Sequence, residues 1–327
     1  MANRTELYVY EQAAVLLSCT LSALGSALII FTYIAWPELR SAPRRLLVCL
    51  SATDMLSALS FGYGAWRMFQ RETWDCVLQG ALSTLANTSS FFWTVAIAVY
   101  LYIFIVRSDQ RLADSLVSWF HLVSWGVPLG ITVAALCLHK IGYDASEVSV
   151  GWCWVSLEAP DHVLWMLLTG KIWEFLAYLT LPVLYILIRK HIRRAHAALS
   201  EYRPILSSSQ VAHTQSSMAD RKMTLIPIIF IGLRIWSTLR FLLMLADLPA
   251  RQNPVLVTLH GIGNTFQGAA NCTMFVFFTK VVRSRLAALF CCCCRGEQPT
   301  HQFSRGLPQQ HLLPDGDTET GTWRTSQ

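Results

Sequence analysis

Seven apolar stretches, each long enough to cross a lipid bilayer, fill most of the 327 residues of this sequence. A transmembrane helix needs about 20 consecutive, mostly apolar residues. Segments of that length lie at residues 12–36, 46–66, 76–106, 115–138, 162–188, 223–246 and 255–279. We therefore predict an all-α membrane protein, a seven-transmembrane helix bundle. An odd number of spans places the chain's two ends on opposite sides of the membrane, which favours a protein that reports from one side to the other.

The composition agrees with one membrane domain carrying two tails. Hydrophobic residues make up 54% of the chain and charged residues only 14%, whereas soluble domains carry about 25% charged residues. The formal net charge of +6 does not indicate nucleic-acid binding, because the positions of the basic residues explain it. We predict an extracellular tail at residues 1–11 and a disordered cytoplasmic tail at residues 295–327, which is rich in Gln, Pro, Thr and Gly.

The basic residues between the spans predict the orientation. If the N-terminus lies outside, the outer segments hold five Lys or Arg residues and the inner segments hold eighteen. An excess of Lys and Arg on short inner loops fixes topology, so we predict a multi-pass plasma-membrane protein with a cytoplasmic C-terminus. No secretory signal peptide is evident. Asn3 opens a glycosylation sequon, Asn3-Arg4-Thr5, on the predicted extracellular tail.

Two cysteines lie in predicted outer positions, and four form a run near the inner surface. Cys76 opens the third span and Cys153 lies in the loop after the fourth, so the oxidising outer face predicts a disulfide between them. Residues 280–290 form a basic amphipathic stretch that we place on the inner membrane surface as a short eighth helix. The cysteines that follow it are palmitoylation candidates: Cys291, Cys292, Cys293 and Cys294. A metal cluster or free thiols are the alternatives, but no histidine or second CxxC supports a metal.

Several motifs on particular spans resemble one receptor class. The third span begins with Cys76 and is predicted to be bonded to the second outer loop, as in G-protein-coupled receptors. Trp125-Gly126-Val127-Pro128 on the fourth span, residues 222–231 (KMTLIPIIFI) on the sixth and Phe266-Gln267-Gly268 on the seventh resemble motifs of the secretin/adhesion-like and cyclic-AMP-receptor-like groups. The third span ends without Asp-Arg-Tyr and the seventh lacks Asn-Pro-x-x-Tyr, so the rhodopsin-like class fits less well.

The resemblance implies a receptor that is not an enzyme and carries no cofactor or metal. It implies a heterotrimeric G protein as partner, an unknown small ligand, contact with membrane lipid, and signalling through movement of helices five and six. Secretin and adhesion receptors carry large outer domains, whereas only eleven residues precede the first span here. We therefore expect the ligand to enter the bundle or to contact the loops.

Polar residues inside the spans are costly to bury and mark candidate sites. Asp54, in the second span, is either a polar hub that changes partners or a buried acid with satisfied hydrogen bonds. Lys171 and Glu174 lie three residues apart on the fifth span, close enough to pair. They either line a ligand pocket or form a structural pair.

The sixth and seventh spans add further polar candidates. Arg234 and Arg240 lie six residues apart, so we expect them to face different directions. We expect Arg240 to reach the lipid headgroups and Arg234 to contact an acid or the seventh span. One side of that span carries a polar stripe that faces the bundle, for packing or for switching: His260, Asn264 and Gln267.

The predicted inner surface is the candidate docking face for a G protein. The basic residues concerned are Arg107, Arg193, Arg194, Arg221 and Lys222. The same charges would be present merely to hold the topology, so charge alone does not separate the two interpretations. Pro227, near the inner end of the sixth span, is a candidate pivot, because proline removes a backbone hydrogen bond and kinks a helix.

Other classes of membrane protein fit less well. A seven-helix transporter or channel without G-protein coupling is the main alternative, but neither an internal repeat nor broken helices at the midplane are evident in the sequence. A retinal-type pump needs a lysine on the seventh span, where none lies. No catalytic motif supports an intramembrane enzyme.

Overall fold

The computed structural model describes residues 8–144, 149–201 and 226–290, and the statements below concern those residues. The chain divides into two compact units, residues 1–284 and 285–327. Several predicted features lie outside the described residues: the sequon at Asn3, the basic pair Arg221 and Lys222, and the cysteine run 291–294.

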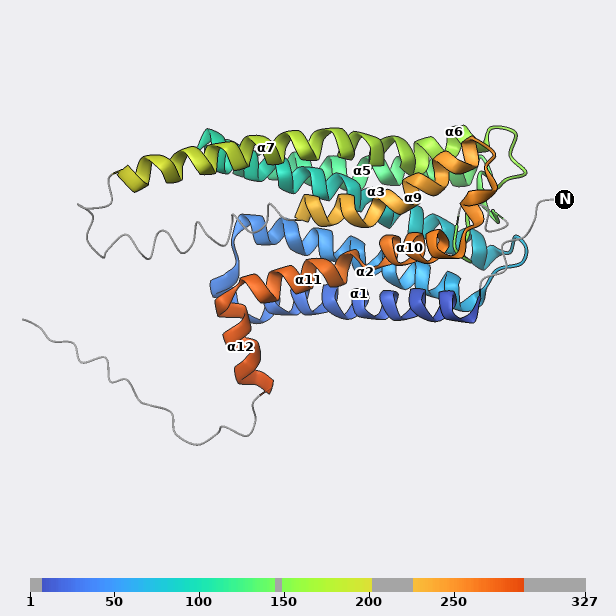
Figure 1. Cartoon of the computed structure of the whole chain (residues 1–327), viewed down its shortest axis with the longest axis horizontal. Helices are drawn as coiled ribbons and strands as arrows, with labels where there is room; N and C mark the ends of the chain where they lie inside the picture. The colour runs from blue at the N-terminus through green and yellow to red at the C-terminus, as the bar shows by residue number, and fades with distance from the viewer. Residues whose placement is uncertain (1–7, 145–148, 202–225, 291–327) are drawn as a thin grey trace, which may run out of the picture. The chain divides into compact units, whose positions relative to one another are not determined.

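The larger unit is a bundle of long helices (Figure 1). Its main elements are α1 (Val9–Ala35), α2 (Ala42–Arg67), α3 (Trp74–Tyr102), α4 (Gln110–Ser115), α5 (Val117–Cys137), α6 (His162–Met166), α7 (Ile172–Glu201), α9 (Ile226–Leu245), α10 (Pro254–Thr265) and α11 (Gln267–Phe278). A π-helical turn, Ile103–Arg107, extends α3, and another, Leu167–Lys171, joins α6 to α7. Two short strands, β1 (Ile141–Gly142) and β2 (Trp154–Val155), pair antiparallel between α5 and α6.

Helix α3 lies at the centre of the bundle. It packs against α2, α5, α7 and α9, and its large side chains Trp93, Ile97 and Leu101 are fully buried. The outer helices instead expose apolar side chains, such as Leu24 on α1 and Leu179 on α7. A helix that is apolar on its exposed face matches a lipid environment, so the arrangement agrees with the predicted membrane bundle.

The seventh span is broken into two helices. Six helices of the described chain are individually long and apolar enough to cross a membrane. The seventh predicted span, residues 255–279, consists of α10 and α11, which have 12 residues each and meet at Phe266. No broken helix was evident in the sequence, and the structure has one here. The backbone N–H of Gly268 donates to Ser22 Oγ on α1 at 2.9 Å, so the chain just after the break bonds to a neighbouring helix.

Gly268 permits close contact between α11 and α1 at this break. A Cβ atom added to Gly268 would lie 2.2 Å from Ser26 Oγ and 2.8 Å from the Ser22 carbonyl oxygen, a backbone atom that cannot rotate away. The glycine of the Phe-Gln-Gly motif is therefore required by packing at this position.

Replacing Gly268 with alanine is expected to destabilise the protein by about 1–3 kcal/mol, because the added methyl group forces α11 away from α1. Thermal melting of the purified protein measures the effect. Gly130→Ala is the matched control, since a Cβ there meets nothing within 4 Å and alanine is the better helix former. Equal melting temperatures for the two variants would contradict the close packing.

The remaining predicted spans correspond to helices of similar extent, with differences at their ends. Helix α7 continues to Glu201, well past the predicted end of the fifth span. Pro128 and Pro182 lie inside α5 and α7. Pro227 is the second residue of α9 as described, so its role as a pivot stays a prediction. The predicted amphipathic segment forms α12 (Lys280–Phe290).

Candidate functional site

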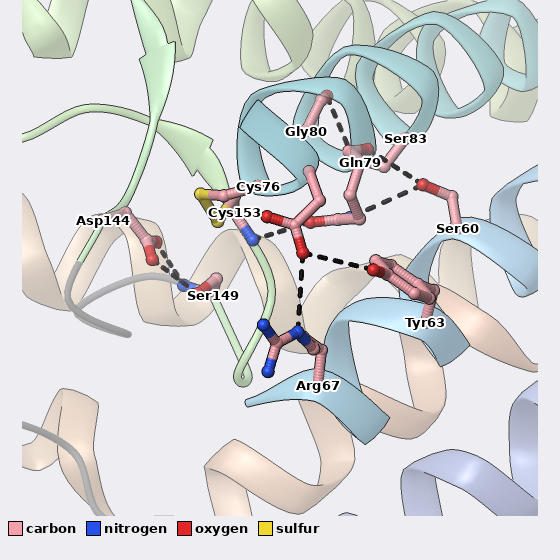
Figure 2. Close-up of a disulfide and its surroundings, with 11 residues drawn as sticks. Ser60, Tyr63, Arg67, Cys76, Gln79, Gly80, Ser83, Asp144, Ser149 and Cys153 are labelled. Atoms are coloured by element: carbon pink, nitrogen blue, oxygen red, sulfur yellow. Dashed lines mark hydrogen bonds and ion pairs between the residues drawn. A yellow bond between two sulfur atoms is a disulfide. The ribbon is translucent and has the colours of Figure 1, made fainter. Parts of the chain in front are cut away.

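A disulfide ties the loop between α5 and α6 to the start of α3. Cys76 and Cys153 are bonded, as predicted, with their Cα atoms 5.5 Å apart. Figure 2 shows the bond between α3 and the loop. Next to it, the backbone N–H of Cys153 donates to Gln79 Oε1 at 2.8 Å, and Ser60 Oγ donates to the Gln79 carbonyl oxygen at 2.9 Å. We call residues 138–161 the hairpin loop and this end of the bundle the disulfide end.

A second contact closes the base of the hairpin loop. Lys140 forms an ion pair with Asp161, and Trp165 Nε1 donates to the same carboxylate at 2.9 Å. The hydrogen bond from the Lys140 ammonium is the largest of the effects that hold the pKa of Asp161 below its ordinary value. A lowered pKa keeps the carboxylate charged, and the charged form is the one that ties the two ends of the loop together.

Trp152 anchors the hairpin loop on the helices. Its ring lies 4.6 Å from the ring of Phe61 and 6.0 Å, edge to face, from the ring of His260. A Cβ added to Gly64 would come within 2.5 Å of Trp152 Cβ, so α2 has room for the loop only because it carries glycine there. The loop therefore covers the helices closely at the disulfide end.

Beneath the loop lies a small cavity of about 40 Å³. Its lining includes Trp152 and Trp154 from the loop, Thr84 and Asn87 from α3, and four polar groups of the other helices: Lys171, Glu174, His260 and Asn264. A concave site with a few convergent polar groups among aromatic side chains is typical of a small-molecule site. The two residues predicted as ligand-pocket candidates, Lys171 and Glu174, both line it.

Lys171 and Glu174 also form the ion pair that their spacing predicted. Lys171 Nζ donates to Glu174 Oε2 at 2.8 Å and to Ser237 Oγ on α9 at 2.5 Å. The other oxygen, Glu174 Oε1, accepts from Tyr178 at 2.8 Å and from Thr238 on α9. Both charged side chains are almost completely buried. The pair therefore both lines the cavity and joins α7 to α9.

Asp54 lies at one end of a hydrogen-bonded relay. Its Oδ1 accepts from Ser90 Oγ at 3.0 Å and its Oδ2 from Asn271 Nδ2 at 2.9 Å. Ser90 Oγ in turn accepts from Gln267 Nε2 at 3.0 Å, and Gln267 Oε1 faces Arg234 Nη2 at 3.4 Å. The relay joins α2, α3, α11 and α9 in the bundle interior.

Arg234 joins the relay to the cavity wall. Its Nη1 lies 3.3 Å from Asn264 Oδ1, and the side chain is 1% exposed. Its guanidinium lies over the rings of Phe91 and Phe230, with its Cζ atom 5.1 and 5.9 Å from the two ring centroids. Such contacts stabilise a buried cation. The expectation that Arg234 contacts the seventh span agrees with these contacts.

Arg240 does not reach toward lipid as we expected. It is fully buried, and its guanidinium donates to the carbonyl oxygens of Ser149 and Arg251, each at 3.0 Å, and lies 2.9 Å from His260 Nδ1. Helical spacing was a poor guide because arginine side chains are long: Arg234 and Arg240 start from different faces of α9 yet reach adjacent turns of α10. The hairpin loop supplies the carbonyl group that makes this burial possible.

The basic candidates for docking lie at the end of the bundle opposite the disulfide. Arg107 is exposed in the π-helical turn after α3, which packs against α7. Arg193 and Arg194 are exposed near the end of α7. These three residues therefore sit on neighbouring elements. Within the described ranges, no cluster of three or more His, Cys, Asp or Glu side chains could hold a metal ion.

Comparisons with known proteins identify the family. A family model described as "7 transmembrane receptor (Secretin family)" matches residues 5–270. The chain is 66% identical to a Homo sapiens protein called G-protein coupled receptor 157, covering 93% of this chain and 91% of that one. It is 63% identical to the Mus musculus protein of the same name, covering 94% and 93%. Squid rhodopsin shares the fold, with a TM-score of 0.65 at 12% identity over 84% of this chain and 78% of that one.

Proposed function

This chain belongs to the secretin family of seven-transmembrane receptors, and we propose that it reads a small ligand in the cavity beneath the hairpin loop and signals to a heterotrimeric G protein. It is a multi-pass membrane protein and a G-protein-coupled receptor. Family membership favours this function over a transporter, a channel or an enzyme. In the proposed orientation the disulfide end faces the outside, in agreement with the positive charge at the opposite end of the bundle.

One observation carries the proposal: hydrogen bonds connect the cavity wall to the middle of the bundle. Asn264 lines the cavity and contacts Arg234, which faces Gln267, and that amide donates to Ser90. The relay ends at the carboxylate of Asp54. A ligand that changes the contacts of Asn264 would therefore change the surroundings of Arg234, on α9. A signal of this kind requires that the ligand bind the two arrangements unequally.

The output is proposed to be a movement of α7 and α9, the fifth and sixth spans. The Lys171–Glu174 pair joins these helices through Ser237 and Thr238 next to the cavity. At the far end, α7 continues to Glu201 and exposes Arg193 and Arg194. We propose that these residues and Arg107 contact the G protein, together with Arg221 and Lys222. Pro227 is the proposed pivot of α9.

Two features outside the described residues complete the proposal. A glycan on Asn3 would lie outside, and acyl chains on residues 291–294 would hold α12 at the inner surface. A membrane anchor of this kind needs a second attachment in addition to one acyl chain, and the spans supply it. The plasma membrane is the proposed location.

A nucleotide-exchange assay tests the proposal. The purified full-length receptor in lipid nanodiscs is expected to accelerate GDP release from at least one class of Gα subunit, compared with empty nanodiscs. The double charge reversal Arg193→Glu/Arg194→Glu is expected to slow that exchange about tenfold, because charge complementarity governs docking rates. Arg71→Glu, an exposed change at the disulfide end, is the matched control and should leave the rate unchanged.

Two results would contradict the proposal. If the receptor accelerates GDP release from no class of Gα subunit, then the purified receptor does not signal through a G protein. Full exchange by the Arg193→Glu/Arg194→Glu variant would show that the G protein docks elsewhere.

A further inference from the structure

Four buried side chains, two of which line the cavity, form a row of three polar contacts. Arg240 Nη1 lies 2.9 Å from His260 Nδ1, His260 Nε2 lies 2.9 Å from Asn264 Nδ2, and Arg234 Nη1 lies 3.3 Å from Asn264 Oδ1. None of the four side chains is more than 8% exposed. We call this row the arginine-bounded chain, because an arginine stands at each end.

The three contacts cannot all be hydrogen bonds at the same time. A guanidinium only donates, a neutral imidazole has one donor and one acceptor nitrogen, and an amide offers one oxygen and one NH₂ group. Each of the three hydrogen bonds needs one acceptor, and the two arginines supply none. His260 and Asn264 supply one acceptor each, so one of the three bonds is always missing. Flipping the amide or moving the imidazole proton moves the missing bond without restoring it. If His260 is protonated, both of its ring nitrogens donate, and only the Asn264 oxygen remains as an acceptor.

The energetics select which bond is missing. Hydrogen bonds from a charged donor are about twice as strong as those between neutral groups, so the two arginine contacts are kept. His260 Nδ1 and Asn264 Oδ1 are then the acceptors, and the central contact joins two donors, His260 Nε2–H and Asn264 Nδ2–H. Both residues line the cavity. The wall therefore presents a pair of adjacent hydrogen-bond donors that have no acceptor between them.

Other groups around the cavity also lack partners. On α3, the buried Thr84 Oγ1 and Asn87 Oδ1 have no hydrogen-bond partner among the described residues. Lys171 uses two of its three ammonium hydrogens, on Glu174 and Ser237. Within the described ranges, Arg234 forms no ion pair with a carboxylate, and its Nε has no partner. Buried polar groups normally have partners, so Thr84 and Asn87 favour a polar occupant of the cavity.

We propose that the cavity binds a small organic carboxylic acid whose carboxylate accepts from His260 Nε2–H and Asn264 Nδ2–H. The inference rests on the proposed function for its role in signalling, but not for its chemistry. The Glu174 carboxylate also lines the cavity, but it is neutralised by Lys171 and accepts from Tyr178 and Thr238. Arg234, which forms no ion pair among the described residues, then supplies the positive charge that favours an anion over a neutral acceptor. Asn87 Oδ1 requires a donor, so a hydroxyl or amino group elsewhere on the acid is expected. Trp152, Trp154 and Phe61 provide the apolar surface for its hydrocarbon part.

The proposal gives ligand binding a direct effect on the relay. Without an anion, the flipped orientation of the Asn264 amide, with Oδ1 toward His260, competes with the Arg234 contact, because either orientation leaves one hydrogen bond missing. With the carboxylate bound, Asn264 Oδ1 stays on Arg234 because its NH₂ group is held by the ligand. The bound state therefore fixes Arg234, and with it Gln267 and the relay to Asp54.

Matched small acids and amides test the chemistry on the purified full-length receptor in nanodiscs. The probes are lactate, propionate and the uncharged propionamide, which suit a small cavity, each at about 10 mM, since molecules of this size bind weakly. The acids are expected to raise the melting temperature by about 2–4 °C, lactate more than propionate, and the amide is expected to have no effect. Equal shifts for the acid and the amide would overturn the proposal.

A variant of Asn264 tests the hydrogen-bond count. Asn264→Asp supplies the third acceptor, so all three contacts become bonds. It is expected to melt about 2–4 °C above the wild type without any probe and to lose the response to the acids. Cys137→Ser, an exposed change outside the cavity lining, is the control and should keep the response to the acids. An Asn264→Asp protein that melts at or below the wild-type temperature, or still responds to the acids, would overturn the proposal.

These measurements are independent of G-protein coupling. Stabilisation by the acids without nucleotide exchange would leave the site intact and remove the proposed function. Acceleration of nucleotide exchange without stabilisation by the acids would keep the proposed function and remove the carboxylate site.

Discussion

Replacing Cys153 with serine is expected to lower the free energy of unfolding by about 4 kcal/mol, one of the two largest effects we foresee. The disulfide joins residues separated by 77 positions, and a cross-link that closes so long a loop removes much of the entropy of the unfolded chain. Gln79 is also affected, because the Cys153 backbone is the donor to its buried side-chain oxygen. Loss of the loop would open the cavity as well.

Thermal melting and the yield of folded receptor measure this effect. Cys76→Ser and the double variant are expected to behave like Cys153→Ser, because all three remove the same bond. Cys137→Ser is the control, since Cys137 is an exposed free cysteine near the end of α5, and it should melt like the wild type. A Cys153→Ser protein that melts like the Cys137→Ser control would mean that the disulfide does not hold the loop.

Replacing Lys171 with methionine is the second change with a large expected effect. It leaves the Glu174 carboxylate buried at the cavity without its cation, and loss of one partner of a buried ion pair costs about 3–5 kcal/mol. Glu174→Gln is expected to cost a similar amount, because it leaves the Lys171 ammonium uncompensated. Both variants should lose stability while keeping the disulfide.

A double-mutant cycle separates the pair from its surroundings. The variant Lys171→Met/Glu174→Gln carries neither charge, and its glutamine oxygen can still accept from Tyr178 and Thr238. We expect this double variant to be more stable than either single variant, because no unpaired charge remains. If the stability lost by the double variant equals the sum of the two single losses, then the coupling energy between Lys171 and Glu174 is zero and the ion pair does not stabilise the receptor.

The spans and the disulfide were accessible from the sequence for clear physical reasons. Hydrophobic length marks a span without knowledge of its neighbours, and an oxidising compartment limits which cysteines can pair. Contacts within one helix were accessible too. Three-residue spacing predicted the pair of Lys171 and Glu174, and helical periodicity placed His260, Asn264 and Gln267 on one side of their span.

Contacts between helices were harder to predict. The partners of Asp54, Ser90 and Asn271, come from two other helices and depend on how these pack. The Ser- and Thr-rich stretch at residues 83–90 was a signal that α3 has a polar face, but it did not say which helix that face meets. Arg240 was misplaced because its burial depends on a carbonyl group of the hairpin loop, Ser149. The break at Phe266 carries no proline and left no mark in the hydrophobic pattern.

The break in the seventh span also has a consequence for how the spans depend on each other in the membrane. Helices α10 and α11 have 12 residues each, so each is about 18 Å long, whereas the hydrocarbon core is about 30 Å thick. Neither half can span the hydrocarbon core alone, so the two cross it together, and backbone groups left without a helical partner at the junction need partners from neighbouring helices. Ser22 of α1 takes one of those groups. The first and last spans are therefore expected to depend on each other in the membrane, so that a receptor without its first span would leave this junction uncovered.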